Sequence, residues 1–139
     1  MASSYSYYTE NLARDTLYKN LDLRFKPHPL TGNINPIKEV EAVKRSLINL
    51  VMTEPGQKPF RPSYGTPVNG LLFNLMFIHP HDVKTVIETS IKRWEPRCEL
   101  LNVEVKSYPE DHAVDVVISF TPKNLEYRYE TEISLKRTL

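Results

Sequence analysis

Residues 53–73 read TEPGQKPFRPSYGTPVNGLLF, and the part of this stretch from Glu54 to Pro67 separates two segments of helical periodicity. That part holds four of the eleven prolines and two of the four glycines of the chain. Proline fixes φ, and glycine permits tight turns that other residues resist. The stretch is therefore predicted to be a rigid, shaped connection between helices and not a flexible linker.

The centre of this connection is predicted to have a structural role. The residues expected to carry it are Pro59, Phe60, Pro62, Tyr64 and Gly65. Buried aromatic side chains contribute much of the packing energy of a small domain. We therefore expect Phe60 and Tyr64 to pin the loop to the core, and contact with a partner is the alternative.

Helices are predicted on both sides of the loop. Upstream, Asn35 and Pro36 have the residue types of a helix start, and an apolar stripe continues to about Met52. Downstream, a short helix is expected over 68–77, and a third helix follows Pro80 and ends before Pro96. The apolar stripe of the first helix is Ile37, Val40, Val43, Leu47, Leu50 and Val51; that of the third is Val83, Val86, Ile87, Ile91 and Trp94.

Alternating apolar and polar residues predict strands at both ends of the chain. One strand is expected over 20–25, and three more are centred on 101–105, 114–120 and 127–135. The connections at 108–112 and 121–124 each contain a proline suited to the first central position of a turn, so the last three strands are expected to form an antiparallel meander.

These elements predict an α+β fold of two layers, with an N-terminal strand, about three helices and then the meander. Residues 1–15 are rich in Ser and Tyr without an apolar period, and they are expected to form a flexible arm. Residues 16–139 are expected to form one domain, because 139 residues match the commonest single-domain size.

Composition bears on the partners that this chain could have. The formal net charge is only +1, which gives no electrostatic signature for nucleic acid. Neither a signal peptide nor a membrane-spanning run is apparent, so no membrane is expected as a partner. Cys98 is the only cysteine, which leaves no intrachain disulfide or thiolate zinc site and suits a reducing cytoplasm.

Candidate catalytic residues are few. Glu54 and Glu95 could form the carboxylate pair of a glycosidase, but a loop carboxylate and an ion-pair partner are the expected roles. Cys98 is interpreted as structural, and the run from His79 to Asp82 as a solvated turn without metal-binding spacing. We expect no enzymatic activity, no cofactor and no metal.

Two motifs in a longer run carry a family resemblance. The run DLRFKPHPLTGNINPIKEVEAVKRSLINLVMTEPGQKPFRPSYGTPVNGLLF at 22–73 is followed by RWEPR at 93–97 and by LLNVEVKSY at 100–108. Together they resemble the small, gene-twenty-five-like baseplate wedge proteins of contractile-tailed bacteriophages, a family that includes the TssE subunit of type VI secretion systems. The resemblance covers about Leu21 to Phe120, and its most specific parts are 59–65 and 95–97.

The resemblance implies a structural protein of a contractile injection machine. Such a protein sits in the virion tail baseplate, assembled in the host cytoplasm, close to tube or hub proteins. It anchors to the helical core bundle of the wedge and initiates the sheath by strand exchange with the sheath protein. The alternative is a peptidoglycan-degrading, lysozyme-like hydrolase of the baseplate, since a lysozyme label also follows this family.

Two groups of residues are the predicted contacts. The resemblance implies that Glu95, Pro96 and Arg97 face the core bundle, and the alternative is that Arg97 forms an ion pair within the domain. The final strand, at about 126–136, has no following element to cover its edge. An uncovered edge is a template for strand addition, and charged residues there discourage self-pairing. The residues expected to do so are Arg128, Glu130 and Glu132, together with Lys136.

Overall fold

The structure, a computed structural model, describes residues 19–21, 24–27, 29–33, 36–73, 79–108, 110–111, 113–123 and 125–136. The chain divides into two compact units, Met1–Val43 and Lys44–Leu139. The predicted arm at 1–15 lies outside the described residues, and the single domain expected over 16–139 stays a prediction.

The described part of the first unit contains two short strands and the start of a helix. Strand β1 (Lys19–Leu21) pairs antiparallel with β2 (Pro36–Lys38), with Asn20 opposite Ile37. Helix α2 begins directly afterwards at Glu39, whose φ of 48° turns the chain sharply. The predicted helix start at Asn35 and Pro36 is therefore wrong, because residues 36–38 pair with a strand that lies far back in the sequence.

The predicted strand at 20–25 is also shorter than expected. β1 ends at Leu21, and Phe25 lies outside it with a φ of 51° and a 58% exposed side chain. A non-glycine residue at positive φ cannot continue a strand. Leu23 lies outside the described residues, and Phe25 does not continue the alternation as part of a strand.

Among the described residues, three helices lie wholly or partly in the second unit: α2 (Glu39–Met52), α3 (Val68–Phe73) and α4 (Pro80–Trp94). Helix α4 starts with proline at its first position, and Asp82 lies in its first turn. It ends as predicted, with the Glu95 N–H donating to the Ile91 carbonyl at 2.9 Å before Pro96. Its buried residues are Val83, Ile87, Ser90 and Ile91.

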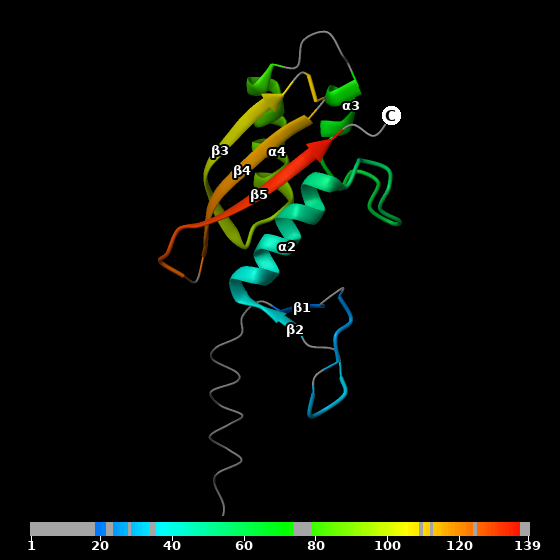
Figure 1. Cartoon of the computed structure of the whole chain (residues 1–139), viewed down its shortest axis with the longest axis vertical. Coiled ribbons are helices and arrows are strands. Elements are labelled where there is room, and N and C mark those ends of the chain that lie inside the picture. The colour runs from blue at the N-terminus through cyan, green and yellow to red at the C-terminus, as the bar shows by residue number, and fades with distance from the viewer. Residues whose placement is uncertain are drawn as a thin grey trace, which may run out of the picture. The chain divides into compact units, whose positions relative to one another are not determined.

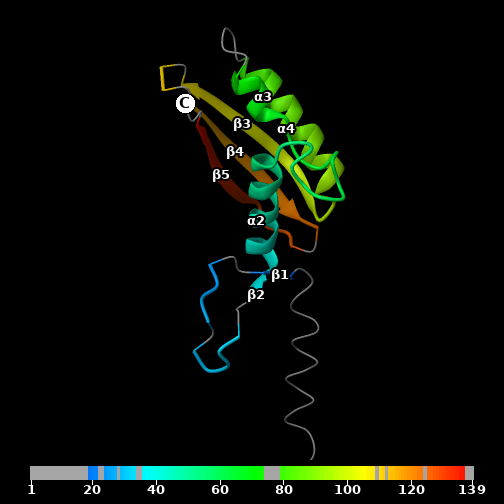
Figure 2. The same ribbon diagram turned by 90° about the vertical axis from the view of Figure 1, so that its right-hand side faces the viewer.

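The C-terminal meander is confirmed. β3 (Cys98–Tyr108), β4 (Ala113–Pro122) and β5 (Tyr129–Lys136) form an antiparallel sheet in the order β3-β4-β5. Helix α4 and the part of α2 that belongs to this unit lie on one side of the sheet (Figures 1 and 2). The sheet residues with buried side chains include Val103, Val114, Val116, Ile118, Phe120, Ile133 and Leu135. The two-layer α+β class is therefore confirmed.

The second turn of the meander differs from the prediction. Pro122 is the last residue of β4, paired with Cys98, and its carbonyl accepts the Leu125 N–H at 2.9 Å. It is thus the first residue of the turn and not its first central residue. A proline fits here because the next hydrogen bond across to Arg97 is donated by the Lys123 N–H, at 3.0 Å, and not by residue 122. Tyr127 precedes β5 and is 73% exposed.

Candidate interaction site

The proline loop, residues 53–67, is closed at its base by hydrogen bonds. The Thr66 N–H donates to the Thr53 carbonyl at 2.8 Å, and the Thr66 hydroxyl donates to the Leu50 carbonyl at 3.2 Å. Inside the loop, the Gly56 N–H donates to the Pro62 carbonyl at 2.7 Å. Gly65 has a φ of 123°, and a Cβ there would lie 2.9 Å from the Glu54 carbonyl carbon. The loop is therefore a shaped, hydrogen-bonded connection, its rigidity stays a prediction, and the close approach at position 65 requires glycine.

Tyr64 packs against helix α4. Its ring meets the Trp94 ring edge-on, with 5.5 Å between centroids. The Lys58 ammonium lies 3.8 Å from the centroid of the Tyr64 ring, a cation–π distance. Burial raises the pKa of the Tyr64 hydroxyl, and the negative charge of Glu95 raises it further. The positive charge of Arg97 lowers this pKa, but by less, so the net shift is upward.

The expectation for Phe60 is wrong. Its side chain is 101% exposed, and its φ is 64°. The Arg61 N–H donates to the Lys58 carbonyl at 3.3 Å, so the chain turns at Pro59 and Phe60. Aromatic character predicted burial, but the ring lies at the tip of a turn, out of reach of the core.

Glu95 and Arg97 form an ion pair within the domain. Arg97 Nε donates to Glu95 Oε1 at 2.6 Å, and Nη2 donates to Oε2 at 2.8 Å. The Ser46 hydroxyl from α2 donates to the same carboxylate. Glu95 is 3% exposed, whereas the Arg97 side chain is 30% exposed. The internal pair is present, Pro96 is exposed beside it, and contact of this segment with a partner stays a prediction.

The electrostatics of this cluster favour an ionised carboxylate. Burial alone would raise the pKa of Glu95, but the hydrogen bonds from Arg97 and Ser46 and the Arg97 charge hold it below its usual range. A glycosidase general acid needs the opposite shift. Glu54, the other candidate, bonds with Gln57 in the proline loop: its N–H donates to Gln57 Oε1 at 3.1 Å.

The Cys98 thiol and the potential metal ligands give no sign of a reactive site among the described residues. Cys98 is buried, and burial together with the Glu95 charge raises the pKa of its thiol to about 12. A thiol with that pKa is a poor nucleophile at neutral pH. Within the described ranges, no three His, Cys, Asp or Glu side chains are grouped to hold a metal ion.

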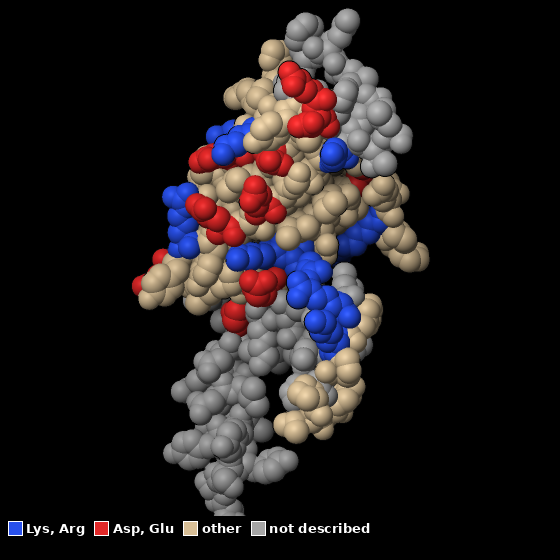
Figure 3. All heavy atoms as spheres, viewed as in Figure 1, with Lys and Arg blue, Asp and Glu red and all other residues tan. Residues whose placement is uncertain are grey.

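The residues predicted on the last strand lie on the face of the sheet turned away from the helices. Arg128 Nη2 donates to Glu130 Oε1 at 2.9 Å and to the Ser119 hydroxyl of β4 at 3.0 Å. Glu132 is exposed on the same side of β5. Figure 3 shows acidic and basic side chains interspersed over this part of the molecule. The structure thus brings Arg128 and Glu130 together, and Ser119 joins them without any local signal in the sequence.

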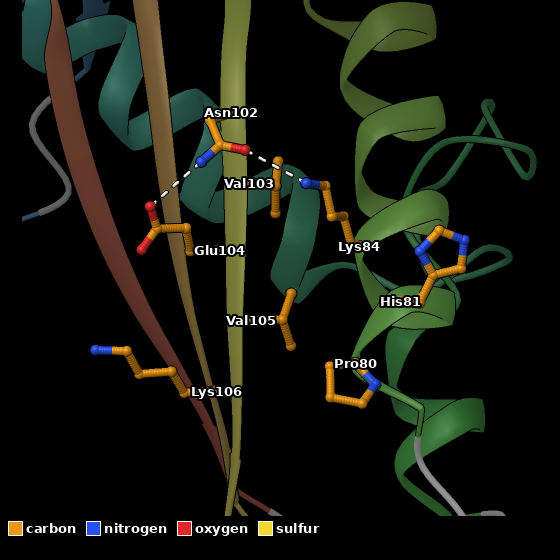
Figure 4. A pocket seen from close by; sticks show the side chains of 8 residues that line it. All are labelled: Pro80, His81, Lys84, Asn102, Val103, Glu104, Val105 and Lys106. Carbon is orange, nitrogen blue, oxygen red and sulfur yellow. Dashed lines mark hydrogen bonds between the residues drawn. The ribbon is translucent and has the colours of Figure 1, made fainter.

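Both outer strands of the sheet have a free edge among the described residues, because β3 and β5 each pair only with β4. The edge of β3 borders a groove of about 410 Å³, which Figure 4 shows between β3 and α4. There Lys84 Nζ donates to Asn102 Oδ1 at 3.3 Å, and Asn102 Nδ2 donates to Glu104 Oε1 at 3.2 Å. Hydrogen bonds thus connect a side chain of α4 with side chains of β3 across this groove. The sequence did not predict this groove.

Comparison with known proteins assigns the family. A family model for the baseplate wedge protein gp25 matches residues 38–124 of this chain. The chain belongs to the gp25 family. It is 30% identical over 106 residues to the baseplate wedge protein gp25 of Enterobacteria phage T4, across 76% of this chain and 80% of that protein. The resemblance noted in the sequence is confirmed, and this gp25-family protein is a structural component of a contractile-tail baseplate.

Solved structures agree with this assignment. A chain in the baseplate of pyocin R2 after contraction is 25% identical, with a TM-score of 0.57, over 76% of this chain and 99% of that one. A protein described as a tail lysozyme from Geobacter sulfurreducens has a TM-score of 0.59 at 16% identity, over 70% and 89%. The second likeness concerns the fold alone. No helix among the described residues is long and apolar enough to cross a membrane.

The gp25 family match includes both the proline loop and the Glu95–Arg97 segment, whereas β5 follows its end at residue 124. The free edge of β5 lies outside the family match, so it is known only from the structure of this chain.

Proposed function

We propose that this protein anchors to the helical core bundle of the baseplate wedge through the Glu95–Arg97 segment and initiates the sheath by accepting a strand of the sheath protein along β5. Tube or hub proteins are its further neighbours. In this proposal it acts through binding alone and catalyses no reaction.

The free edge of β5 is the observation that supports sheath initiation best. One side of β5 is buried through Thr131, Ile133 and Leu135, so the strand is held firmly in the sheet. Its other side is charged and exposed. A fixed strand with an unpaired edge can hydrogen-bond an added strand along its length, which is the usual geometry of strand addition. The exposed charges on β5 then select a complementary partner over a second copy of this chain.

The anchor is supported by the different exposure of its two charged residues. Glu95 is buried and fixes the guanidinium of Arg97, whose side chain remains partly exposed. A guanidinium held in one orientation loses little entropy when it binds the carboxylates or helix-end carbonyls of a partner. The ion pair within the domain and a contact of Arg97 with a partner are therefore compatible, since the ion pair orients the guanidinium for that contact.

The hydrolase alternative receives less support from the geometry. Its acid would have to be Glu95 or Glu54. The pKa of Glu95 is lowered by its partners, and the Glu54 carboxylate accepts a hydrogen bond from Gln57 Nε2 at 3.5 Å. A turbidity assay on purified peptidoglycan tests this directly. We expect no clearing by the wild-type protein, and clearing that Glu95→Gln abolishes would establish the hydrolase.

The binding proposal is tested by hydrogen exchange of the wedge-bound protein with and without the sheath protein. We expect the amides of β5 to gain protection when the sheath protein is added, while those of β3 remain as they were. Protection that appears on β3 alone would place the docking edge on the opposite side of the sheet and overturn the assignment to β5.

A further inference from the structure

Phe60 is displayed on the surface at an energetic cost. Its ring is completely exposed, and its backbone adopts a φ of 64°, which is unfavourable for a bulky side chain. Asparagine or glycine would satisfy that conformation better, and a polar side chain would interact better with water. Residues held in such conformations are concentrated where proteins bind ligands and partners.

The loop around Phe60 holds the ring in place. The flanking residues Pro59 and Pro62 restrict the backbone, and the hydrogen bond from Gly56 to Pro62 closes the turn beneath it. Tyr64 then fastens the loop to Trp94 of α4. A side chain presented in one orientation by a rigid loop loses little entropy on binding, which is the property of an interface anchor.

The charges beside Phe60 indicate the kind of surface that it fits. Residues 57–67 include two cations, Lys58 and Arg61, and no carboxylate. The Lys58 ammonium is held over the Tyr64 ring, and Arg61 is exposed next to Phe60. An apolar group with a cation on either side complements an apolar pocket with carboxylates around its rim.

We propose that Phe60 is an anchor that inserts into an apolar, acid-rimmed pocket on another protein of the baseplate wedge. This contact is separate from strand addition at β5 and from the Glu95–Arg97 segment. The Phe60 contact depends only on the membership of the chain in a baseplate. It can therefore be absent while the proposed function is correct, and it can be present while the proposed function is wrong.

The decisive variant is Phe60→Gly, because it removes the ring and relieves the backbone. We expect its melting temperature to equal or exceed that of the wild type, since glycine adopts a positive φ without strain. We also expect its affinity for the purified wedge complex, assembled without this protein, to fall by about tenfold or more, as for the loss of an aromatic anchor. A residue with a purely structural role cannot give a more stable protein that binds less well.

The matched control is Tyr127→Ala, which removes another exposed aromatic ring outside the proline loop. It is expected to leave wedge affinity unchanged. Phe60→Ser, which keeps the strained backbone, is expected to bind as weakly as Phe60→Gly. Wild-type affinity of either Phe60 variant would overturn the proposal.

The chemistry of the pocket is tested by charge reversal and by cross-linking. Lys58→Glu combined with Arg61→Glu is expected to weaken wedge binding, with the loss reduced at high salt. A photoreactive phenylalanine analogue at position 60 of the assembled wedge is expected to label a segment containing Asp or Glu. Labelling of a basic segment would overturn the acid-rimmed pocket. Binding of the free protein to anionic lipid vesicles that is lost in Phe60→Gly would assign the ring to a membrane instead.

Discussion

Arg97 donates two hydrogen bonds to the carboxylate of Glu95, and only Pro96 separates the two residues in the sequence. Pro96 turns the chain between helix α4 and strand β3, so the side chains on either side of it can face each other. The acid is almost completely buried and the base is partly exposed. The pair therefore joins the end of α4, through Ser46, to α2 and presents Arg97 at the surface.

Arg97→Ala is expected to reduce stability as well as wedge binding. It leaves the Glu95 carboxylate buried, with Ser46 as its remaining described side-chain partner. We expect a loss of about 2 kcal/mol in the free energy of unfolding, which is below the range for a broken buried pair because Arg97 is partly exposed. Urea denaturation measures this loss. The double variant Glu95→Gln with Arg97→Ala should regain part of it, and an unchanged midpoint for Arg97→Ala alone would mean that the pair contributes nothing to folding.

The stability of the protein should decrease in acid through Glu95. Its pKa in the folded protein is below the ordinary value of 4.5, so the unfolded chain binds a proton at this site more readily. The stabilisation is therefore complete above the ordinary value and is lost as the pH falls through the folded one. Denaturation of wild type and Glu95→Gln between about pH 3 and 7 checks this. The variant should show the shallower decline, and parallel curves would exclude Glu95 as the cause.

Gly65→Ala is expected to destabilise the proline loop strongly. Its φ of 123° and the nearby carbonyl groups of Thr53 and Glu54 leave no room for a Cβ, so we expect a loss of about 2 kcal/mol or more. Gly70→Ala is the matched control, because nothing lies within 4 Å of its Cβ position and it is in α3. That change should be neutral or stabilising by about 0.5–1 kcal/mol. Equal effects of the two changes in thermal melting would contradict the described loop.

Trp94→Ala should release the proline loop from α4. Trp94 is only half-buried, so we expect a loss of about 2 kcal/mol, below the range for a fully buried tryptophan. Ile87→Ala, at a completely buried position of the same helix, is expected to cost about 3–4 kcal/mol. Hydrogen exchange of the Gly56 and Tyr64 amides should quicken in the first variant alone. Unchanged exchange there would show that Tyr64 does not depend on Trp94.

The sequence predicted those elements whose signals are local. Helix α4 begins at a proline and ends before Pro96, and the alternating residues of β5 match a buried and an exposed face. In β3 the predicted alternation fails at Leu101, which lies at a register shift and is 49% exposed. The start of α2 was missed because residues 36–38 take part in a pairing with β1 that no local pattern shows. The burial of Phe60 was predicted wrongly because residue type indicates burial only on average. Its position at the tip of a turn leaves the side chain exposed.

The candidate site was predictable in part for the same reason. Arg97 and Glu95 are close in sequence, so their pairing was among the expected alternatives. The contribution of Ser46 comes from a residue on α2, far away along the chain, and only the packing of the helices brings it to Glu95. The groove between Lys84 and Asn102 likewise depends on how α4 lies against β3.

Sheath nucleation by an edge variant tests the central claim most directly. A proline is placed in β5 at a position whose N–H points away from β4, identified by rapid hydrogen exchange, and a second variant carries a proline at the equivalent outward position of β3. The rate of sheath polymerisation is measured on wedges that contain each folded protein. Strand addition at β5 predicts that the β5 variant binds the wedge but fails to nucleate sheath, because proline lacks the donor and obstructs the added strand, while the β3 variant nucleates normally. Nucleation at the wild-type rate by the folded β5 variant would contradict it.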